Sequence, residues 1–181
     1  MTGAKNYLNP FEFSEADTCR EYVTPAIQAA GWGDSPFEIA EQRSFTDGRI
    51  VLTGRTAKRR EGKRADYLLR YRRDLTLAVV EAKAPVGDGL QQAKDYAEIL
   101  GLKFAYATNG REIIEFDFLT GIEQKIDRYP TPDELWHRQT VGTPLTSTVA
   151  VKTMLQSLNH STGKPPRYYQ EIAINRTVSA I

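Results

Sequence analysis

Two apolar segments joined by a short polar turn are the clearest pattern in the chain. Residues 65–71 and 75–83 are rich in Leu, Val, Ala and Tyr, and Arg72-Arg73-Asp74 separates them. Short runs of this composition on either side of a polar turn are typical of paired strands. The second run is apolar for most of its length, which indicates a central strand covered on both faces of a sheet. The sequence therefore predicts an antiparallel hairpin over residues 65–83.

Helical and strand-like patterns alternate around this hairpin. A helix is predicted over Glu15–Ala30, where Ser14 precedes it, Gly31 ends it and Pro25 is expected to kink it. The other predicted elements are two extended pieces around the turn dipeptide Asp47-Gly48 within residues 37–53, a helix over residues 90–100 after Pro85, Gly87 and Gly89, and strands over residues 104–108 and 112–116 around Asn109-Gly110. This alternation predicts an α/β fold in which helices flank a central mixed β-sheet of four or five strands.

The texture of the sequence changes at Tyr129, where proline, threonine and serine become frequent. Two short helices are predicted there, near residues 133–138 and 148–158, and a last helix is predicted over residues 167–181. We therefore divide the chain into a main domain over residues 1–128, a connector over residues 129–166 and a separate segment over residues 167–181.

Composition narrows the possible classes of protein. The chain has 181 residues, of which 40% are hydrophobic, and this suffices for one main core. Its 24 basic and 23 acidic side chains give a formal net charge of +1, so any contact with a nucleic acid must depend on local clusters of charge. Cys19 is the only cysteine, which excludes an internal disulfide and indicates a reducing compartment, by default the cytoplasm. No apolar stretch approaches the ~18 residues that a membrane span needs.

Three charged residues of the predicted hairpin are candidates for chemistry. Glu81 and Lys83 are two positions apart in one strand, so their side chains leave the sheet on the same face. Antiparallel pairing across the turn would bring Asp66 beside Glu81. Two neighbouring carboxylates attract a divalent cation, and oxygen ligands suit Mg²⁺ or Mn²⁺. The backbone carbonyl of Ala82 is a further candidate ligand.

A metal ion beside a lysine is suited to phosphodiester hydrolysis. The cation polarises a phosphoryl oxygen and lowers the pKa of its bound water, while Lys83 can hold the attacking water or offset charge on the phosphorus. An ordinary ion pair between Glu81 and Lys83 explains the same spacing equally well. Gln92 and Tyr96 lie one helical turn apart and can face this site, although a surface amide and a half-buried ring explain them too.

Several short motifs in a fixed order resemble one nuclease family. They are Ala65-Asp66-Tyr67, Val80-Glu81-Ala82-Lys83, Gln92-Ala93-Lys94-Asp95-Tyr96-Ala97 and Thr108-Asn109-Gly110. In this order they resemble the N-terminal nuclease domain of type I restriction enzyme motor (R) subunits, which belongs to the PD-(D/E)xK superfamily. The resemblance runs from about Phe13 to Trp136 and includes the opening helix. One departure is Ala65, which stands where the name of the motif has a proline; that proline is often absent in this family.

The resemblance implies a restriction-endonuclease-like core and a role for each motif residue. Many members of the family carry an additional acidic residue in the opening helix, so Glu15 or Glu21 is expected to approach the metal. The implied site residues are the metal ligands Asp66 and Glu81, the catalytic lysine Lys83, and an auxiliary pair formed by Gln92 and Tyr96.

The implied function is Mg²⁺-dependent hydrolysis of double-stranded DNA without sequence specificity of its own. In the family, a specificity subunit recognises the target, modification subunits methylate it, and an ATP-driven motor delivers the DNA. Arg167–Ala173 resembles the start of a superfamily 2 helicase motor, but the chain contains no Gly-x-x-x-x-Gly-Lys-Ser/Thr loop to cradle phosphates. ATP is therefore expected to act only in a longer subunit, of which this sequence would be the N-terminal piece.

Two other functions fit the same residues. One is a stand-alone PD-(D/E)xK repair or junction-resolving nuclease, which would cut strongly without a motor. The other is a catalytically silent domain that binds DNA or docks subunits and does not bind metal. The basic run Lys58–Arg64, just before Asp66, is either a solvated loop or a contact to DNA phosphates.

Overall fold

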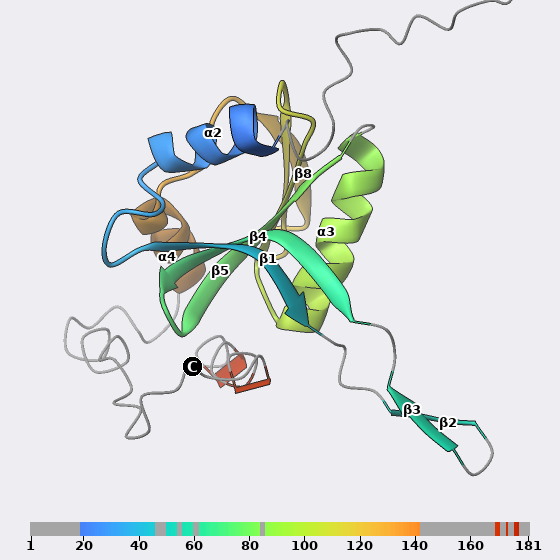
Figure 1. Cartoon of the computed structure of the whole chain (residues 1–181). Helices are drawn as coiled ribbons and strands as arrows, with labels where there is room; N and C mark the ends of the chain where they lie inside the picture. The colour runs from blue at the N-terminus through green and yellow to red at the C-terminus, as the bar shows by residue number, and fades with distance from the viewer. Residues whose placement is uncertain are drawn as a thin grey trace, which may run out of the picture.

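The architecture is built around a six-stranded mixed sheet with the order β1-β4-β5-β6-β7-β8 (Figure 1). A computed structural model describes residues 19–45, 50–53, 56–59, 62–83 and 86–141, together with residues 169–170, 173 and 176–177. Helices cover both faces of the sheet. The predicted α/β fold with a mixed sheet is confirmed, with six strands in place of four or five.

The predicted hairpin forms the middle of the sheet. Strand β4 (Lys63–Arg72) pairs antiparallel with β5 (Leu75–Ala82), and Leu69 lies opposite Ala78. All eight residues of β5 are buried, as expected for an apolar run that is covered on both faces. Strand β5 then pairs in parallel with β6 (Phe104–Thr108), and such a parallel connection requires a crossover element.

Helix α3 (Val86–Leu100) is that crossover and covers one face of the sheet. It begins four residues before the predicted start at Leu90, because Gly87 and Gly89 are part of its first turn and do not prevent helix formation there. Its buried residues Ala93, Tyr96, Ala97 and Leu100 pack against side chains of the sheet that include Leu68, Val79 and Ala105.

Three shorter helical segments cover the other face of the sheet. They are η1 (Cys19–Val23), a π-helical turn; α2 (Thr24–Ala29), which follows it directly; and α4 (Pro132–Thr140). Pro25 lies in the first turn of α2, where its missing N–H is tolerated, and the helix changes from π to α geometry just before it. The Glu15–Thr18 part of the predicted helix lies outside the described residues. No helix in the part of the chain that the structure describes is long and apolar enough to cross a membrane.

The two extended pieces predicted around Asp47-Gly48 are present, but they do not pair with each other as the turn dipeptide suggests. Strand β1 (Glu38–Phe45) pairs with β4, whereas β2 (Ile50–Thr53) pairs with β3 (Thr56–Arg59) in a separate ribbon. Apolar residues of β1 reach both cores, with Ile39 on one side of the sheet and Phe45 on the other. Burial of these side chains favours pairing with β4 over a turn dipeptide whose influence is only local.

The remaining strands form one edge of the sheet. Strand β7 (Ile113–Asp117) begins and ends one residue later than predicted and pairs with β6. Strand β8 (Ile122–Ile126) pairs with β7. Strand β8 was not predicted, because four of its five residues are exposed and it carries no alternating apolar pattern. The helix predicted over residues 148–158 lies outside the described residues.

Helix α4 confirms the short helix predicted near residues 133–138, and a capping box starts it. The Thr131 hydroxyl accepts a hydrogen bond from the Glu134 N–H at 3.2 Å, and the Glu134 carboxylate accepts one from the Thr131 N–H at 2.8 Å. Leu135 and Trp136 of this helix are buried in the core. The predicted connector thus begins with an element that packs on the sheet, while the domain boundary at residue 128 stays a prediction.

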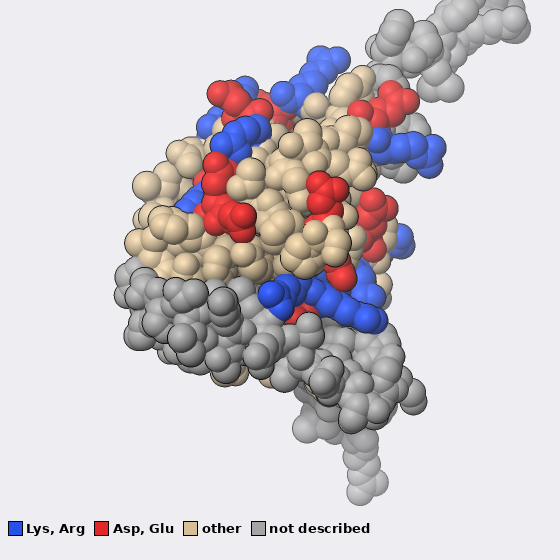
Figure 2. Space-filling model, turned by 90° about the vertical axis from the view of Figure 1, so that its left-hand side faces the viewer, with Lys and Arg blue, Asp and Glu red and all other residues tan. Residues whose placement is uncertain are grey.

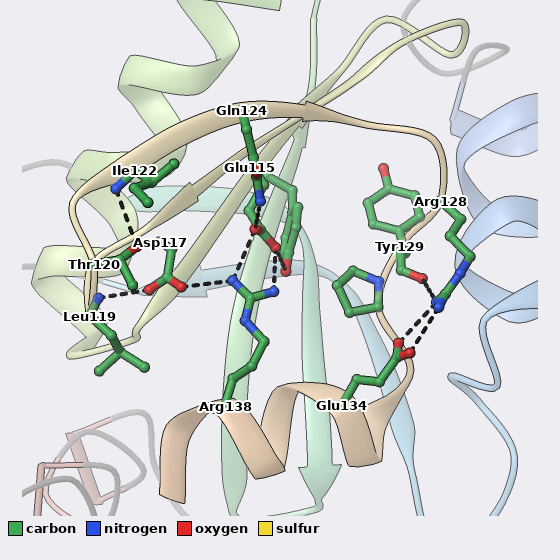
Figure 3. A network of polar contacts seen from close by, with 12 residues as sticks. Glu115, Asp117, Leu119, Thr120, Ile122, Gln124, Arg128, Tyr129, Glu134 and Arg138 are labelled. Atoms are coloured by element: carbon green, nitrogen blue, oxygen red, sulfur yellow. Dashed lines mark hydrogen bonds and ion pairs between the residues drawn. The ribbon is translucent and has the colours of Figure 1, made fainter. Parts of the chain in front are cut away.

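A buried ionic network fastens α4 to β7 (Figure 3). Arg138 donates to both carboxylate oxygens of Glu115 at 2.9 Å and to Asp117 Oδ2 at 2.7 Å. The Tyr106 hydroxyl and the Gln124 amide also donate to Glu115, at 2.6 and 3.1 Å. Burial by itself would raise the pKa of Glu115, but the hydrogen bonds from Arg138, Tyr106 and Gln124 outweigh it and lower that pKa below its usual range. We call this set of residues the Arg138 clamp.

Replacing Arg138 with methionine tests the clamp. The change leaves Glu115 buried without its cation, so the free energy of unfolding should fall by about 3–5 kcal/mol near neutral pH. Because the pKa of Glu115 is lowered in the folded state, its stabilising contribution is present above the unfolded pKa and is lost as the pH falls through the folded pKa. The deficit of the variant should therefore shrink in acid, which urea unfolding at neutral and acidic pH measures.

The exposed pair between Arg128 and Glu134 provides the matched control. Arg128→Met removes an ion pair of similar length, 2.8 Å, from the surface, where solvent screens it. Little change in stability is expected at either pH. An equal effect of the two substitutions would contradict the special role of the Arg138 clamp.

Candidate functional site

The two candidate carboxylates meet where the backbone pairing of β4 with β5 ends. The last paired residues at this end are Tyr67 and Val80. Just beyond them, the Asp66 N–H donates to Glu81 Oε1 at 3.1 Å, and the Ala82 N–H donates to Asp66 Oδ2 at 2.9 Å. Side-chain carboxylates thus replace backbone carbonyls as acceptors, and the proximity of Asp66 and Glu81 predicted from the sequence is present.

Gln92 of helix α3 connects the acidic residues to Lys83. Its amide nitrogen donates to Glu81 Oε2 at 2.8 Å, and its amide oxygen accepts a long hydrogen bond from Lys83 Nζ at 3.4 Å. The same nitrogen donates to the Tyr96 hydroxyl at 3.0 Å. The structure therefore brings the five predicted residues into one chain of contacts, from Asp66 at one end to Tyr96 at the other.

Burial divides this group into an inner and an outer part. Glu81 is only 3% exposed, Asp66 is half-buried and Lys83 is exposed. Burial, the charge of Glu81 and, to a smaller extent, the charge of Asp66 raise the pKa of Tyr96. Tyr96 is therefore a neutral phenol beside the carboxylates. Its ring and that of Phe45 pack in a T-shaped arrangement with the centroids 5.0 Å apart.

Gly89 allows helix α3 to approach Lys83. A Cβ atom at this position would lie 3.1 Å from Lys83 Cβ and 3.6 Å from Ala107 Cβ, whereas one at Gly87 would meet nothing within 4 Å. The sequence pattern predicts that both glycines precede the helix and lie outside it. Gly89 instead permits the close contact that places Gln92 over Glu81.

The chemistry of the donor set fits a hard divalent cation. Carboxylate oxygens of Asp66 and Glu81 and the carbonyl of Ala82 are oxygen donors of the kind that Mg²⁺ and Mn²⁺ prefer. A carboxylate oxygen has two lone pairs, so it can accept a hydrogen bond and still face a cation. Within the described residues, no group of three or more His, Cys, Asp or Glu side chains could hold a metal ion. A cation held by these described residues would complete its shell with backbone oxygen and water, as is usual for Mg²⁺.

A hollow of about 600 Å³ borders Asp66 on the side of η1. Arg20 and Arg64 line it, and so does Gln42, whose amide donates to Asp66 Oδ1 at 3.2 Å. Glu21, one of the two acids expected near the metal, is exposed and does not line this hollow. The other, Glu15, lies outside the described residues. Sequence reasoning missed Arg20 and Gln42, because an exposed arginine and glutamine give no signal of their own.

A second, larger hollow lies between β8 and α4 and contains none of these residues. Its volume is about 940 Å³, and its lining includes Gln124, Arg128 and His137. It therefore borders the Arg138 clamp and is separate from the carboxylate site.

Comparison with known proteins gives two close likenesses. The chain is 36% identical over 183 residues to the type I restriction enzyme EcoAI endonuclease subunit of Escherichia coli, and the match covers 96% of this chain and 22% of that protein. A solved structure, described as a fragment of an HsdR subunit of a type I restriction enzyme from Vibrio vulnificus YJ016, is 56% identical with a TM-score of 0.78. This match covers 93% of the present chain and 32% of the chain in the solved structure. No protein-family model matches the chain.

Both similar proteins belong to type I restriction enzymes and are much longer than this chain. Together with the six-stranded mixed sheet, they confirm the predicted restriction-endonuclease-like fold. The chain spans less than a third of the length of either protein, 22% and 32% respectively.

A pair of alanine substitutions tests the close approach of α3. Gly87→Ala should raise the free energy of unfolding by about 0.5 kcal/mol, because alanine favours helix and the position is open. Gly89→Ala should lower it by about 1–2 kcal/mol, because the new methyl group crowds Lys83. Thermal unfolding of the two variants measures the difference. A gain in stability at both positions would show that α3 can move away without cost.

Proposed function

Since this chain is homologous over nearly its whole length to endonuclease subunits of type I restriction enzymes, we propose that it is the metal-dependent, DNA-cleaving domain of such a subunit. It hydrolyses phosphodiester bonds of double-stranded DNA and has no sequence specificity of its own. One observation carries the proposal: the carboxylates of Asp66 and Glu81 accept hydrogen bonds from the backbone at one end of the β4–β5 pair. A lysine, which can face a phosphate, stands two residues further along.

The proposed cofactor is Mg²⁺, with Mn²⁺ as a substitute. Asp66, Glu81 and the carbonyl of Ala82 would hold it. When bound, the cation supplies Lewis-acid assistance to the phosphoryl oxygen and makes a water molecule more acidic. The N–H groups of Asp66 and Ala82 hold the two carboxylates in fixed orientations, so the protein need not reorganise them.

Lys83 supplies positive charge next to the carboxylates. Its exposed ammonium group can offset the negative charge that develops on phosphorus as water attacks, or hold that water in place. Gln92 contacts both Lys83 and Glu81, so it sets the distance between the ammonium group and the metal ligands. Tyr96, a neutral phenol, accepts the second hydrogen bond of the Gln92 amide and holds it in that position.

Basic residues around the site are the proposed contacts to DNA. Arg20 and Arg64 line the hollow next to Asp66, and Lys63 Nζ lies 5.4 Å from the centroid of the Tyr96 ring. The face toward the viewer in Figure 2 has acidic and basic side chains interspersed with a wide uncharged area. Contacts from the three basic residues to phosphates would give affinity without reading sequence, in agreement with a domain that has no specificity of its own.

The domain is proposed to act within a larger cytoplasmic assembly. Its partners would be the specificity and modification subunits of a restriction complex. A motor in the longer subunit would consume ATP and deliver the DNA. Two alternatives predict different experimental results. A stand-alone repair or junction nuclease would need none of these partners, and a catalytically silent domain would bind no metal.

Conservative replacements at three positions test the proposed chemistry. Asp66→Asn and Glu81→Gln remove carboxylate charge, and Lys83→Met removes the ammonium group. In the complete subunit assembled with its partners, each should reduce plasmid cleavage at least about 100-fold, because each removes electrostatic stabilisation of the transition state. ATP hydrolysis by the same assembly should remain, which shows that the motor is intact.

Glu98→Gln is the matched control, since Glu98 is an exposed carboxylate on the same helix as Gln92. Its cleavage rate should equal that of the wild type. Continued cutting by Asp66→Asn or Glu81→Gln would refute the assignment. Strong cleavage by the isolated chain would favour the stand-alone nuclease, and failure to bind Mn²⁺ in calorimetry would favour the silent domain.

The salt dependence of DNA binding tests the basic residues. Alanine at Arg20, Lys63 or Arg64 should reduce the slope of log affinity against log salt concentration by about 1 for each phosphate that the variant no longer neutralises. The reduction should be the same for unrelated DNA sequences. Lys125→Ala, on the exposed edge strand β8, should leave the slope unchanged. Unchanged slopes in all variants would remove these residues from the DNA interface.

A further inference from the structure

Gln42 has an unusual backbone conformation at a position that faces the candidate site. Its φ angle is 52°, and it is the one non-glycine residue with positive φ among those that the structure describes. Side chains with a Cβ atom rarely adopt this left-handed conformation, and glutamine is not among the residues that tolerate it best. Such a conformation persists only where the surroundings enforce it, and it often accompanies function.

This conformation bends strand β1 and the strand beside it. Ala40 and Phe45 pack on the α3 side of the sheet although they are five residues apart, and a regular strand would point them to opposite faces. In β4, Ala65 and Leu68 show the same change, since both face α3 although they are three residues apart. The neighbours of Gln42 still pair regularly with β4, as Glu41 with Tyr67 and Arg43 with Ala65. The bend therefore occurs where Gln42 lies across from Asp66.

The bend directs the Gln42 amide to one oxygen of Asp66. Gln42 Nε2 donates to Asp66 Oδ1 at 3.2 Å, while the Ala82 N–H donates to Asp66 Oδ2 at 2.9 Å. The carboxylate is thus held at both oxygens, from β1 on one side and from β5 on the other. Gln42 itself is exposed, so burial of its side chain does not explain the unfavourable backbone.

We propose that Gln42 is a positioning residue that orients the Asp66 carboxylate for cation binding, with the bend in β1 as the device that delivers its amide. This inference rests on the proposed function, because it assigns Gln42 a role only through Asp66. Gln42 is not a metal ligand here, since its amide nitrogen is a donor that faces Asp66. Its action is like that of other groups that hydrogen-bond a metal ligand, whose loss weakens metal affinity by about 10–100-fold.

Gln42→Gly separates positioning from structure. Glycine adopts positive φ without strain, so the variant should unfold at the same temperature as the wild type or a higher one. It has no amide to donate, so the dissociation constant for Mn²⁺, measured by calorimetry on the whole chain, should rise about 10-fold. Gln42→Asn also tolerates this backbone but is one methylene shorter, and it should show the same loss.

Ser44→Gly is the matched control, because Ser44 is an exposed residue of the same strand with ordinary φ. It should lower the unfolding temperature and leave the affinity for Mn²⁺ unchanged. The opposite effects of the two glycine substitutions distinguish a positioning role from a purely structural one.

Hydrogen exchange at the Ala82 N–H provides a readout without metal. If Gln42 holds Asp66 in place, exchange of this N–H should be several-fold faster in Gln42→Gly than in the wild type, while core amides of β5 keep their rates. Equal exchange and equal Mn²⁺ affinity in wild type and Gln42→Gly would overturn the inference. Absence of Mn²⁺ binding by the wild type would instead overturn the proposed function, and faster Ala82 exchange would still show that Gln42 orients Asp66.

Discussion

The structure depends on how backbone N–H groups find hydrogen-bond acceptors where the pairing of β4 with β5 ends. Peptide N–H groups at that point must find acceptors, because buried donors without partners are costly. The carboxylates of Asp66 and Glu81 accept from the backbone of Asp66 and Ala82, and each carboxylate thereby gains a fixed orientation. Gln92 from α3 and Gln42 from β1 then hold the outer oxygens. The same contacts that complete the sheet thus also assemble the candidate metal site.

The parts of the fold that were predictable have strong local signals. The apolar run of β5, the polar turn after β4 and the helical pattern of α3 each depend on neighbouring residues, and all three are present. The two strands around Asp47-Gly48 are present, but β1 pairs with β4, because burial of apolar side chains over a long sequence distance decides the pairing. Strand β8 carries almost no apolar signal, and it exists because the edge of β7 offers it backbone partners.

The candidate site was predictable to the same extent. Spacing alone placed Glu81 and Lys83 on one face. The antiparallel turn placed Asp66 beside Glu81, as the hydrogen bond from the Asp66 N–H to the Glu81 carboxylate shows. Gln42 could not be found in this way, since it is far from Asp66 in sequence and its effect depends on an unusual φ angle. Of the two acidic residues expected from the opening helix, Glu21 does not line the hollow beside Asp66, whereas Arg20 does, and Glu15 lies outside the described residues.

The five predicted catalytic residues and the proposed ligand Ala82 all come from the uninterrupted segment 66–96, which consists of most of one hairpin and the helix that follows it. Contacts between residues close in sequence form rapidly, because little chain entropy is lost when their loops close. A nascent chain could thus assemble this arrangement before β7, β8 and α4 have been synthesised, with the later elements serving to lock it. An insertion in the β2–β3 ribbon, which lies outside both this segment and strand β1, can change the surroundings of the site and leave its internal geometry intact.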